Sequence, residues 1–279
     1  MPTPSDIDDA FIKQYQSEVH AYFQRQGSKL MNTVRMKSGV VGASTVIQTY
    51  GTATATQKTR NGDVQQSNPA HAPVEITLSD WYVQIPIDNL DELKISHNER
   101  EAAVNAGAAA LGQKIDDQII TAMAATTRSS GTYVAGVTSA TLAAAVEKYW
   151  ETDVPEDGQS YAVLANHAWQ EFKVISRVSS SDFTGDLYPF LKGRKAYEWD
   201  NIVWMQHTGL PLANTDDRDC FLYHKSAVGL AFGQPIVTDV WWDGRAQAHL
   251  VTLKMSSGAK LIDERGVVKW KVDDDTAIS

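Results

Sequence analysis

Two hydrophobic patterns with different periods follow one another in the first half of the chain. Residues 45–56 are rich in Thr, Val, Ile and Tyr, which favours extended strand. In residues 96–125 the apolar side chains recur every three or four positions, which predicts a single helix about 45 Å long. An extended strand pair that leads into a long helix is unusual in a compact enzyme. It is typical of a subunit that overlaps its neighbours in a larger assembly.

The dipeptide Asn61-Gly62 predicts the tight turn of a β-hairpin. With these two residues at the centre of the turn, Arg60 lies opposite Asp63. The same register places Ile47 opposite Ile76, so that the apolar residues of both strands share one face. Because a two-stranded ribbon is marginally stable in water, we expect this hairpin to lie against another surface, such as a neighbouring subunit.

The second strand of this hairpin changes the face that its apolar residues occupy. Within residues 74–78 the apolar side chains fall at even positions, whereas within residues 81–85 they fall at odd positions. A phase change of one residue moves the buried side chains to the other face of a strand. We therefore predict a bulge or bend near Ser79-Asp80.

Helix signals frame residues 96–125. Ser96 and Glu99 have the spacing of a capping box, and Ser129-Ser130-Gly131 follows the end of the pattern. The predicted apolar stripe consists of Val104, Ala108, Leu111, Ile115, Ile119 and Ala122. Small residues keep the first half of the helix narrow, so it can pack flat against a sheet.

The remainder of the chain alternates shorter helical and strand patterns. Thr138 and Ser139 precede one helical pattern, and Asn166 can cap a second. Strands are predicted over residues 161–164, 202–205, 221–223, 251–255 and 268–272. The alternation predicts an α/β-type region over residues 138–245, which ends at a hairpin turn at Asp243-Gly244.

The first 35 residues are polar with scattered apolar positions. These positions recur at three- to four-residue spacing, which predicts one short amphipathic helix. Tyr15 and Phe23 belong to this pattern and are candidates for contacts with another subunit. A tail with one helix and no partner is the alternative interpretation.

The composition is that of a globular protein with an acidic surface. The 279 residues carry a net charge of -9, and 43% of them are hydrophobic. Because an acidic surface repels phosphate backbones, duplex DNA or RNA is not expected as a tight ligand, although such a surface suits the wall of a nucleic-acid container. The single cysteine, Cys220, cannot form an internal disulfide, and neither a signal peptide nor a membrane span is apparent. We expect a soluble protein made in a cytoplasm.

Residue types that serve catalysis or metal binding do not form compact motifs. The seven histidines are too far apart for a His-x-x-x-His site, and no Gly-x-Ser-x-Gly or phosphate-binding loop is present. Cys220 is expected to be a small buried residue in a strand. Asp116 and Asp117 point to different sides of a helix, and the acidic run 216–219 is expected to be an exposed turn rather than a cation site. We predict no catalytic residue, metal site or cofactor.

The eight tryptophans admit two interpretations. They are spread over many segments, so core packing and interface anchoring are expected. A sugar-binding platform formed by Trp81 or the Trp241-Trp242 pair is one alternative. A hydrolase built from scattered Asp, Glu and Trp side chains is another.

In their order along the chain, these segments resemble the major capsid proteins of tailed bacteriophages, of the Hong Kong 97 type. The resemblance spans nearly the whole chain. The local patterns that carry it are residues 161–166, 201–204 with 210–211, 225–231, and 257–263 with 266–268. It implies an α+β, Hong Kong 97-like capsid fold with an N-terminal arm, an extended β-hairpin loop, a long spine helix in a peripheral domain and an α/β axial domain.

The resemblance also implies a division of the chain. The expected parts are an N-terminal arm over 1–35, an extended loop over 36–80, a peripheral domain over 81–134 with the spine helix at 96–125, an axial domain over 135–245, and a return to the peripheral domain with an acidic tail over 246–279.

The implied function is that of a structural major capsid protein. Such a protein self-assembles through hexamers and pentamers into an icosahedral shell around double-stranded phage DNA. A portal protein is an implied partner. Because only about 35 residues precede the extended loop, we expect any scaffold to be a separate protein, or to be unnecessary. The implied location is the virion capsid, assembled in the bacterial host cytoplasm without a membrane. Encapsulin shells and gene transfer agents share this fold and are the alternatives.

The tip of the extended loop supplies further candidate contacts with other subunits, and these are Lys58, Arg60, Asn61 and Asp63. Lys58 and Arg60 are expected to meet acidic surface on a neighbour. Charges at the rim of an interface set register and salt dependence more than affinity.

Overall fold

The computed structural model describes residues 27–88, 99–133, 136–175, 178, 196–214 and 216–274. The predicted N-terminal helix, with Tyr15 and Phe23, lies outside these residues, and so does Ser96 of the predicted capping box. The chain divides into two compact units. The first takes most of its described residues from Trp81–Gln113 and Ile236–Met255, and the second consists of Ser28–Asp80, Lys114–Pro235 and Ser256–Ser279.

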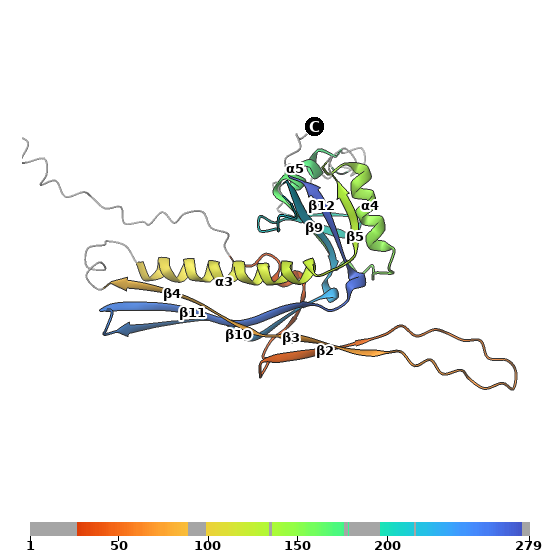
Figure 1. The fold of residues 1–279 in the computed structure, drawn as a ribbon, viewed down its shortest axis with the longest axis horizontal. Coiled ribbons are helices and arrows are strands. Elements are labelled where there is room, and N and C mark those ends of the chain that lie inside the picture. The colour runs from red at the N-terminus through yellow and green to blue at the C-terminus, as the bar shows by residue number, and fades with distance from the viewer. Residues whose placement is uncertain are drawn as a thin grey trace, which may run out of the picture. The chain divides into compact units, whose positions relative to one another are not determined.

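A six-stranded mixed sheet forms the centre of the second unit. Its strand order is β5 (Ser129–Tyr133), β12 (Val267–Asp273), β9 (Asp217–His224), β6 (Ser160–Leu164), β8 (Ile202–Gln206) and β7 (Ala196–Trp199). The helices α4 (Ser139–Trp150) and α5 (Asn166–Val174) pack against this sheet (Figure 1). The structure confirms the strands predicted in this part of the chain and the combination of helix and sheet.

The two helices begin differently. Thr138 directly precedes α4 as predicted, and it caps the helix: its hydroxyl accepts a hydrogen bond from the Thr141 N–H while its own N–H donates to the Thr141 hydroxyl. The prediction that Asn166 caps α5 is wrong. Asn166 is the first residue of that helix, and its Oδ1 accepts a hydrogen bond from the Gln206 side chain at 2.7 Å.

Aromatic side chains fill the core between α5 and the sheet. Phe172 stacks on Trp204 with ring centroids 4.9 Å apart and on Trp169 with centroids 5.6 Å apart. The indole N–H of Trp204 donates to the Trp199 carbonyl at 3.1 Å. Cys220 is fully buried in β9 as predicted, and burial raises the pKa of its thiol to about 12.

The second unit also contains a two-stranded ribbon of β2 (Ser44–Tyr50) and β3 (His71–Thr77) (Figure 1). The predicted hairpin is present, but the predicted register is wrong, because Ile47 pairs with Val74 rather than Ile76. The turn is the cause: its central pair is Arg60-Asn61, with Asn61 in the left-handed conformation at φ 71°. The Gly62 N–H closes this turn on the Thr59 carbonyl at 3.0 Å. The pairing partner of each β2 residue therefore moves by two positions along β3. Because side chains alternate with a period of two, the apolar side chains of both strands stay on the same face of the ribbon.

The predicted phase change occurs where the chain passes from one sheet to another. β3, a strand of the ribbon, ends at Thr77. The next strand, β4 (Ser79–Asp88), is an edge strand of a four-stranded sheet. Leu78 lies between them and donates its N–H to the Ala43 carbonyl at 2.9 Å. The break therefore falls at Leu78, one residue before the predicted bend.

The four-stranded sheet has the order β1 (Arg35–Lys37), β10 (Val228–Asp243), β11 (Ala248–Leu261) and β4. The predicted turn after Asp243 connects β10 to β11, and Val251, Leu253 and Met255 are buried as their alternation predicts. No helix among the described residues is long and apolar enough to cross a membrane.

The long helix α3 spans Glu99–Ala124. The second half of the predicted stripe is buried, but Val104 and Ala108 are only half-buried. Ala103 and Gly107 carry the buried face there instead. Gly107 lies so close to Leu253 in the first unit that a Cβ atom would approach its Cδ1 to 2.4 Å, which explains why this half of the helix is narrow.

Gly258 makes a second close approach, and its replacement is expected to destabilise the second unit. A Cβ atom at this position would lie 2.1 Å from the Thr77 carbonyl oxygen, so Gly258→Ala forces the backbone at the end of β3 to move. We expect a loss of about 1–3 kcal/mol in the free energy of unfolding. Gly244→Ala is the control, because its nearest neighbour would be 3.9 Å away. Equal urea midpoints for the two variants would contradict this prediction.

Candidate assembly surfaces

The ribbon of β2, β3 and their connecting loop carries four of the predicted contact residues. Lys58, Arg60, Asn61 and Asp63 are all exposed at or beside its turn. No ion pair joins any of them to another residue within the described ranges. The structure thus brings these four together at one end of the ribbon, whereas Tyr15 and Phe23 lie outside the described residues.

The backbone of the loop forms few hydrogen bonds within the subunit. The Gly51 N–H donates to the Ala70 carbonyl at 2.8 Å, and beyond this bond the Thr54 N–H reaches only the Ser67 hydroxyl at 3.4 Å. Within the described residues, no backbone–backbone hydrogen bond joins the two sides of the loop between Gly51–Ala70 and the Thr59–Gly62 turn. Unpaired N–H and C=O groups on extended chain are available for pairing with another polypeptide.

The root of the ribbon is held firmly in the second unit. Ile47 and Ile76 form a buried cluster with Ala231 of β10, and the half-buried Val40, Leu78 and Ile262 pack around it. This is the shared apolar face that the sequence predicts for the hairpin. The ribbon is therefore apolar and fixed at its base, and polar along its loop.

A buried carboxylate fixes the start of the described chain to α3. Asp116 is fully buried, and it accepts hydrogen bonds from the Ser28 hydroxyl at 2.5 Å and from the N–H groups of Lys29 and Leu30, each at 3.1 Å. His207 Nε2 lies 3.0 Å from the same carboxylate. The Gly209 N–H donates to His207 Nδ1 at 3.1 Å, so the proton of the imidazole is on Nε2 and points at Asp116.

These contacts decide the charge of Asp116. Burial by itself raises the pKa of this carboxyl, but the hydrogen bonds from His207, Ser28 and the two backbone N–H groups outweigh burial and hold the pKa below its ordinary value. The carboxylate is therefore ionised and bonded on both oxygens. It ties residues 28–30, which lie near the end of the predicted arm, to the long helix.

The sequence predicts only part of this arrangement. Asp117 is exposed while Asp116 is buried, so the two point apart as predicted. The anchoring role of Asp116 was missed, because its partners lie 86 to 91 positions away along the chain. The available signal was its position one turn before Ile119-Ile120, within the apolar half of α3.

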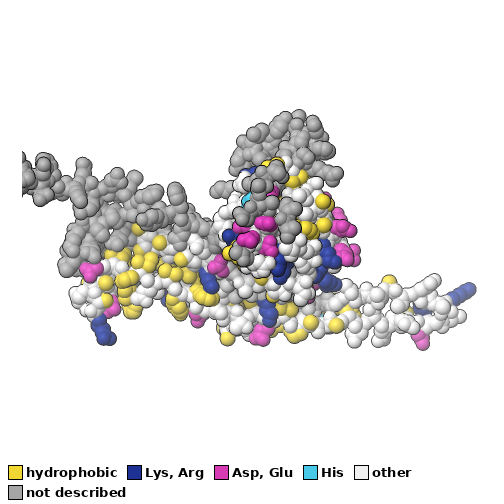
Figure 2. Space-filling model, turned by 45° about the horizontal axis from the view of Figure 1, so that its top comes forward, with side chains coloured by type: hydrophobic (Ala, Val, Ile, Leu, Met, Phe, Trp, Pro, Cys, Tyr) yellow, Lys and Arg dark blue, Asp and Glu magenta, His cyan; other side chains and the backbone are white. Residues whose placement is uncertain are grey.

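A second candidate surface lies in the first unit, along the hairpin of β10 and β11. β1 pairs only with Gly229–Ala231 of β10, so within the described residues the later part of β10 has a free edge. Apolar side chains that are exposed there are Ile236, Val240, Trp241 and Trp242. Figure 2 shows apolar side chains gathered over this unit. Three other tryptophans (Trp169, Trp204 and Trp270) are buried, so tryptophans serve both the core and the surface.

One cluster resembles the side-chain set of a hydrolase. The Ser226 hydroxyl lies 2.7 Å from His224 Nδ1, and His224 Nε2 lies 2.9 Å from Asp157. However, the Ser226 N–H also donates to His224 Nδ1, at 3.3 Å, so His224 caps the short helix η2 (Lys225–Ala227). This contact between residues two positions apart is a helix cap, and it accounts for the cluster without catalysis.

The described residues thus combine an open ribbon with an anchored root, a long narrow helix and a free apolar sheet edge. The model of the phage capsid protein family matches residues 7–274, and the chain belongs to this family. It is therefore a structural phage capsid protein, a component of the virion capsid. None of the curated proteins matches the chain.

Solved structures share this fold over nearly the full length of both chains. The acid-stable capsid of Helicobacter pylori bacteriophage KHP30 has a TM-score of 0.77 at 12% identity and covers 98% of each chain. The capsid of cyanophage P-SCSP1u has a TM-score of 0.76 at 17% identity, with 98% of this chain and 95% of that chain covered. The capsid of a native GTA particle has a TM-score of 0.74 at 9% identity, with 94% of this chain and 96% of that chain covered.

Proposed function

We propose that this protein assembles through hexamers and pentamers into a closed icosahedral shell that encloses double-stranded phage DNA. The observation that carries the proposal is the ribbon, whose loop has exposed charges and unpaired backbone groups on a root that is packed into the second unit. The exposed N–H and C=O groups of such a loop bond to water in the free subunit, and they can exchange these bonds for backbone bonds to another chain. Family membership supports the same conclusion.

Contacts between subunits are part of this proposal. Lys58 and Arg60 would meet acidic surface on a neighbour, with Asn61 and Asp63 fixing the register beside them. The exposed position of all four supports this role. Tyr15 and Phe23 in the N-terminal arm are proposed as apolar contacts on the strength of their spacing in the sequence.

The partners and the domain division complete the proposal. A portal protein and a separate scaffold protein would join assembly in the host cytoplasm, as the resemblance to phage major capsid proteins implies. The arm, extended loop, peripheral domain, axial domain and acidic tail would have the bounds predicted from the sequence.

A gene transfer agent shell is the second candidate function. The similarity to the capsid of the GTA particle favours it as a specific alternative, because the two chains cover each other almost completely. Sequencing the DNA inside purified particles separates the two. A single phage genome supports the first function, and fragments of host DNA support the second.

Electron microscopy and sedimentation of the purified protein test the proposed function directly. We expect uniform hollow shells, or rings of five or six subunits, with sedimentation coefficients far above that of a 30.7 kDa monomer. Only monomers or small oligomers, even with crowding agent or co-expressed scaffold, would refute shell assembly.

A further inference from the structure

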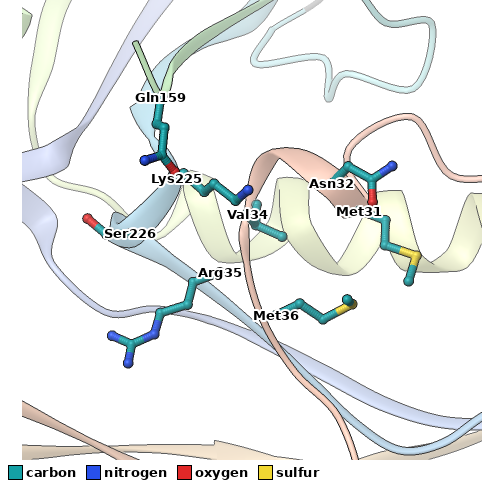
Figure 3. Close-up of a pocket in the computed structure, with 8 residues that line it drawn as sticks. All are labelled: Met31, Asn32, Val34, Arg35, Met36, Gln159, Lys225 and Ser226. Carbon is teal, nitrogen blue, oxygen red and sulfur yellow. The ribbon is translucent and has the colours of Figure 1, made fainter. Parts of the chain in front are cut away.

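An open pocket of about 480 Å³ lies in the second unit, beside the start of the described chain (Figure 3). Three segments form it: the short helix η1 (Met31–Thr33) with β1, the residue before β6, and η2. Arg35, Lys225, Gln159 and Ser226 lie on one side, and the two methionines lie on the other together with Asn32 (Figure 3). The lining residues that matter here are Met31, Asn32, Arg35, Met36, Gln159 and Lys225.

The charge of this pocket is opposite to that of the protein as a whole. Residues 28–37 contain Lys29, Arg35 and Lys37 and no acidic residue, and Lys225 faces them from η2. Neither Arg35 nor Lys225 forms an ion pair with another described residue. In a chain with a net charge of -9, two uncompensated cations beside one pocket favour an acidic ligand.

The methionines narrow the chemistry of that ligand. Met36 is 49% exposed, and Met31 is half-buried at the pocket wall. Flexible thioether side chains adapt to apolar groups of irregular shape, whereas the charged phosphates of a nucleic-acid backbone do not make apolar contacts with them. Cations on one side and methionines on the other instead suit a peptide that carries carboxylates and apolar side chains close together.

The chain itself contains such a peptide. Residues 6–12 read Asp-Ile-Asp-Asp-Ala-Phe-Ile, with three carboxylates, four apolar residues and no cation. The acidic residues near the other end of the chain are less available, because Asp274 already pairs with Arg218 and Asp273 belongs to β12.

We propose that residues 6–12 of a second copy of this chain dock in the pocket, with Asp8 and Asp9 against Arg35 and Lys225 and with Phe11 against Met31 and Met36. The proposal rests on the proposed shell function, which supplies the second copy at close range. The Ser28–Leu30 contacts with Asp116 hold the chain beside the pocket, so an arm from the same copy would have to reverse its direction to enter.

Disulfide trapping between two single-cysteine variants tests this docking. Asn32 is exposed at the pocket and has no internal hydrogen bond, so Asn32→Cys leaves the fold intact. Isotopically labelled Ala10→Cys chain is mixed with unlabelled Asn32→Cys chain under assembly conditions and oxidised. The native Cys220 is fully buried and does not compete. We expect a heterodimer in which mass spectrometry identifies a disulfide between positions 10 and 32.

Charge reversal provides the specific control. Arg35→Glu with Lys225→Glu in the Asn32→Cys chain is expected to lower the heterodimer yield by about tenfold, because both ion pairs become repulsive. Asp8→Lys with Asp9→Lys in the Ala10→Cys chain is expected to restore it. This restoration also shows that the reversed chain is folded, and circular dichroism melting checks the same point.

The outcomes separate the docking from the shell function. Shells without the 10–32 disulfide, or a yield that charge reversal does not change, overturn the docking and leave the shell function standing. Formation of the 10–32 disulfide in small oligomers, without shells, supports the docking and overturns the shell function. A disulfide found only within one chain of the Ala10→Cys/Asn32→Cys double variant overturns the role of a second copy. Loss of binding of a DNA oligonucleotide upon charge reversal, with no disulfide, would assign the pocket to phosphate instead.

Discussion

Deletion of residues 55–68 is expected to leave a folded subunit that no longer forms closed shells. The deleted residues are exposed or half-buried and lie beyond the last backbone bond of the ribbon, so joining Thr54 to Pro69 through an Asn-Gly pair removes none of the buried core. It does remove the exposed charges and the unpaired backbone that we assign to contacts with a neighbour. Sedimentation and electron microscopy should show subunits or small oligomers, and thermal melting should be unchanged within a few degrees.

A loop of the same length separates the effect of sequence from that of chain length. Replacing residues 55–68 by Gly and Ser keeps the reach of the loop but removes Lys58, Arg60 and Asp63. We expect this variant to assemble poorly and with little dependence on salt, since the rim charges are gone. Normal particles from the deletion variant would exclude an essential role for the loop.

Asp116→Ala is expected to cost about 3–5 kcal/mol of unfolding free energy at neutral pH. The substitution leaves the Ser28 hydroxyl, two backbone N–H groups and the His207 Nε2–H without the carboxylate that accepts their hydrogen bonds. Urea unfolding followed by tryptophan fluorescence measures the loss. Asp117→Ala is the matched control, because Asp117 is exposed on the same turn of α3, and it should cost less than about 1 kcal/mol.

The pH dependence of this variant has a definite sign. The pKa of Asp116 is held below its ordinary value of 3.8, so its stabilising contribution is complete above that value and is lost as the pH falls toward the folded-state pKa. The difference in stability between the original protein and Asp116→Ala should therefore be constant from pH 5 to pH 7 and narrow below about pH 4. A gap that widens in acid would contradict an ionised, hydrogen-bonded Asp116.

Local signals in the sequence predicted the elements that depend on neighbours in the chain. Thr138 and Thr141 form their capping box within four residues, and Val251, Leu253 and Met255 reveal their strand by alternation alone. The centre of the ribbon's turn is Arg60-Asn61 and not the predicted Asn61-Gly62. Asn61, like glycine, can adopt the left-handed conformation, so the turn did not need Gly62 at its centre. Because a shift of one residue at the turn moves both strands, each residue of β2 pairs two positions away from its predicted partner in β3.

What the sequence could not predict are pairings between distant segments. Nothing in the order of residues indicates that Ser28, Asp116 and His207 meet, because the fold brings together three parts of the chain with no common spacing. The pocket beside Arg35 and Lys225 is formed in the same way, by segments almost 200 positions apart. The exposure of Lys58 and Arg60 could be predicted from the sequence, because exposed turns have a local signature; their contacts with a neighbour stay a prediction.

The open backbone between Gly51 and Ala70 has a consequence for hydrogen exchange. Amide protons without a partner exchange with deuterium in solvent almost as fast as those of an unfolded chain, whereas amides in the six-stranded sheet exchange only when the second unit opens. In the free subunit the loop should therefore be the fastest-exchanging segment of the ribbon. A neighbour that pairs with these amides would slow each of them individually, so deuterium uptake by residues 52–69 reads out the occupancy of this contact during assembly, one amide at a time.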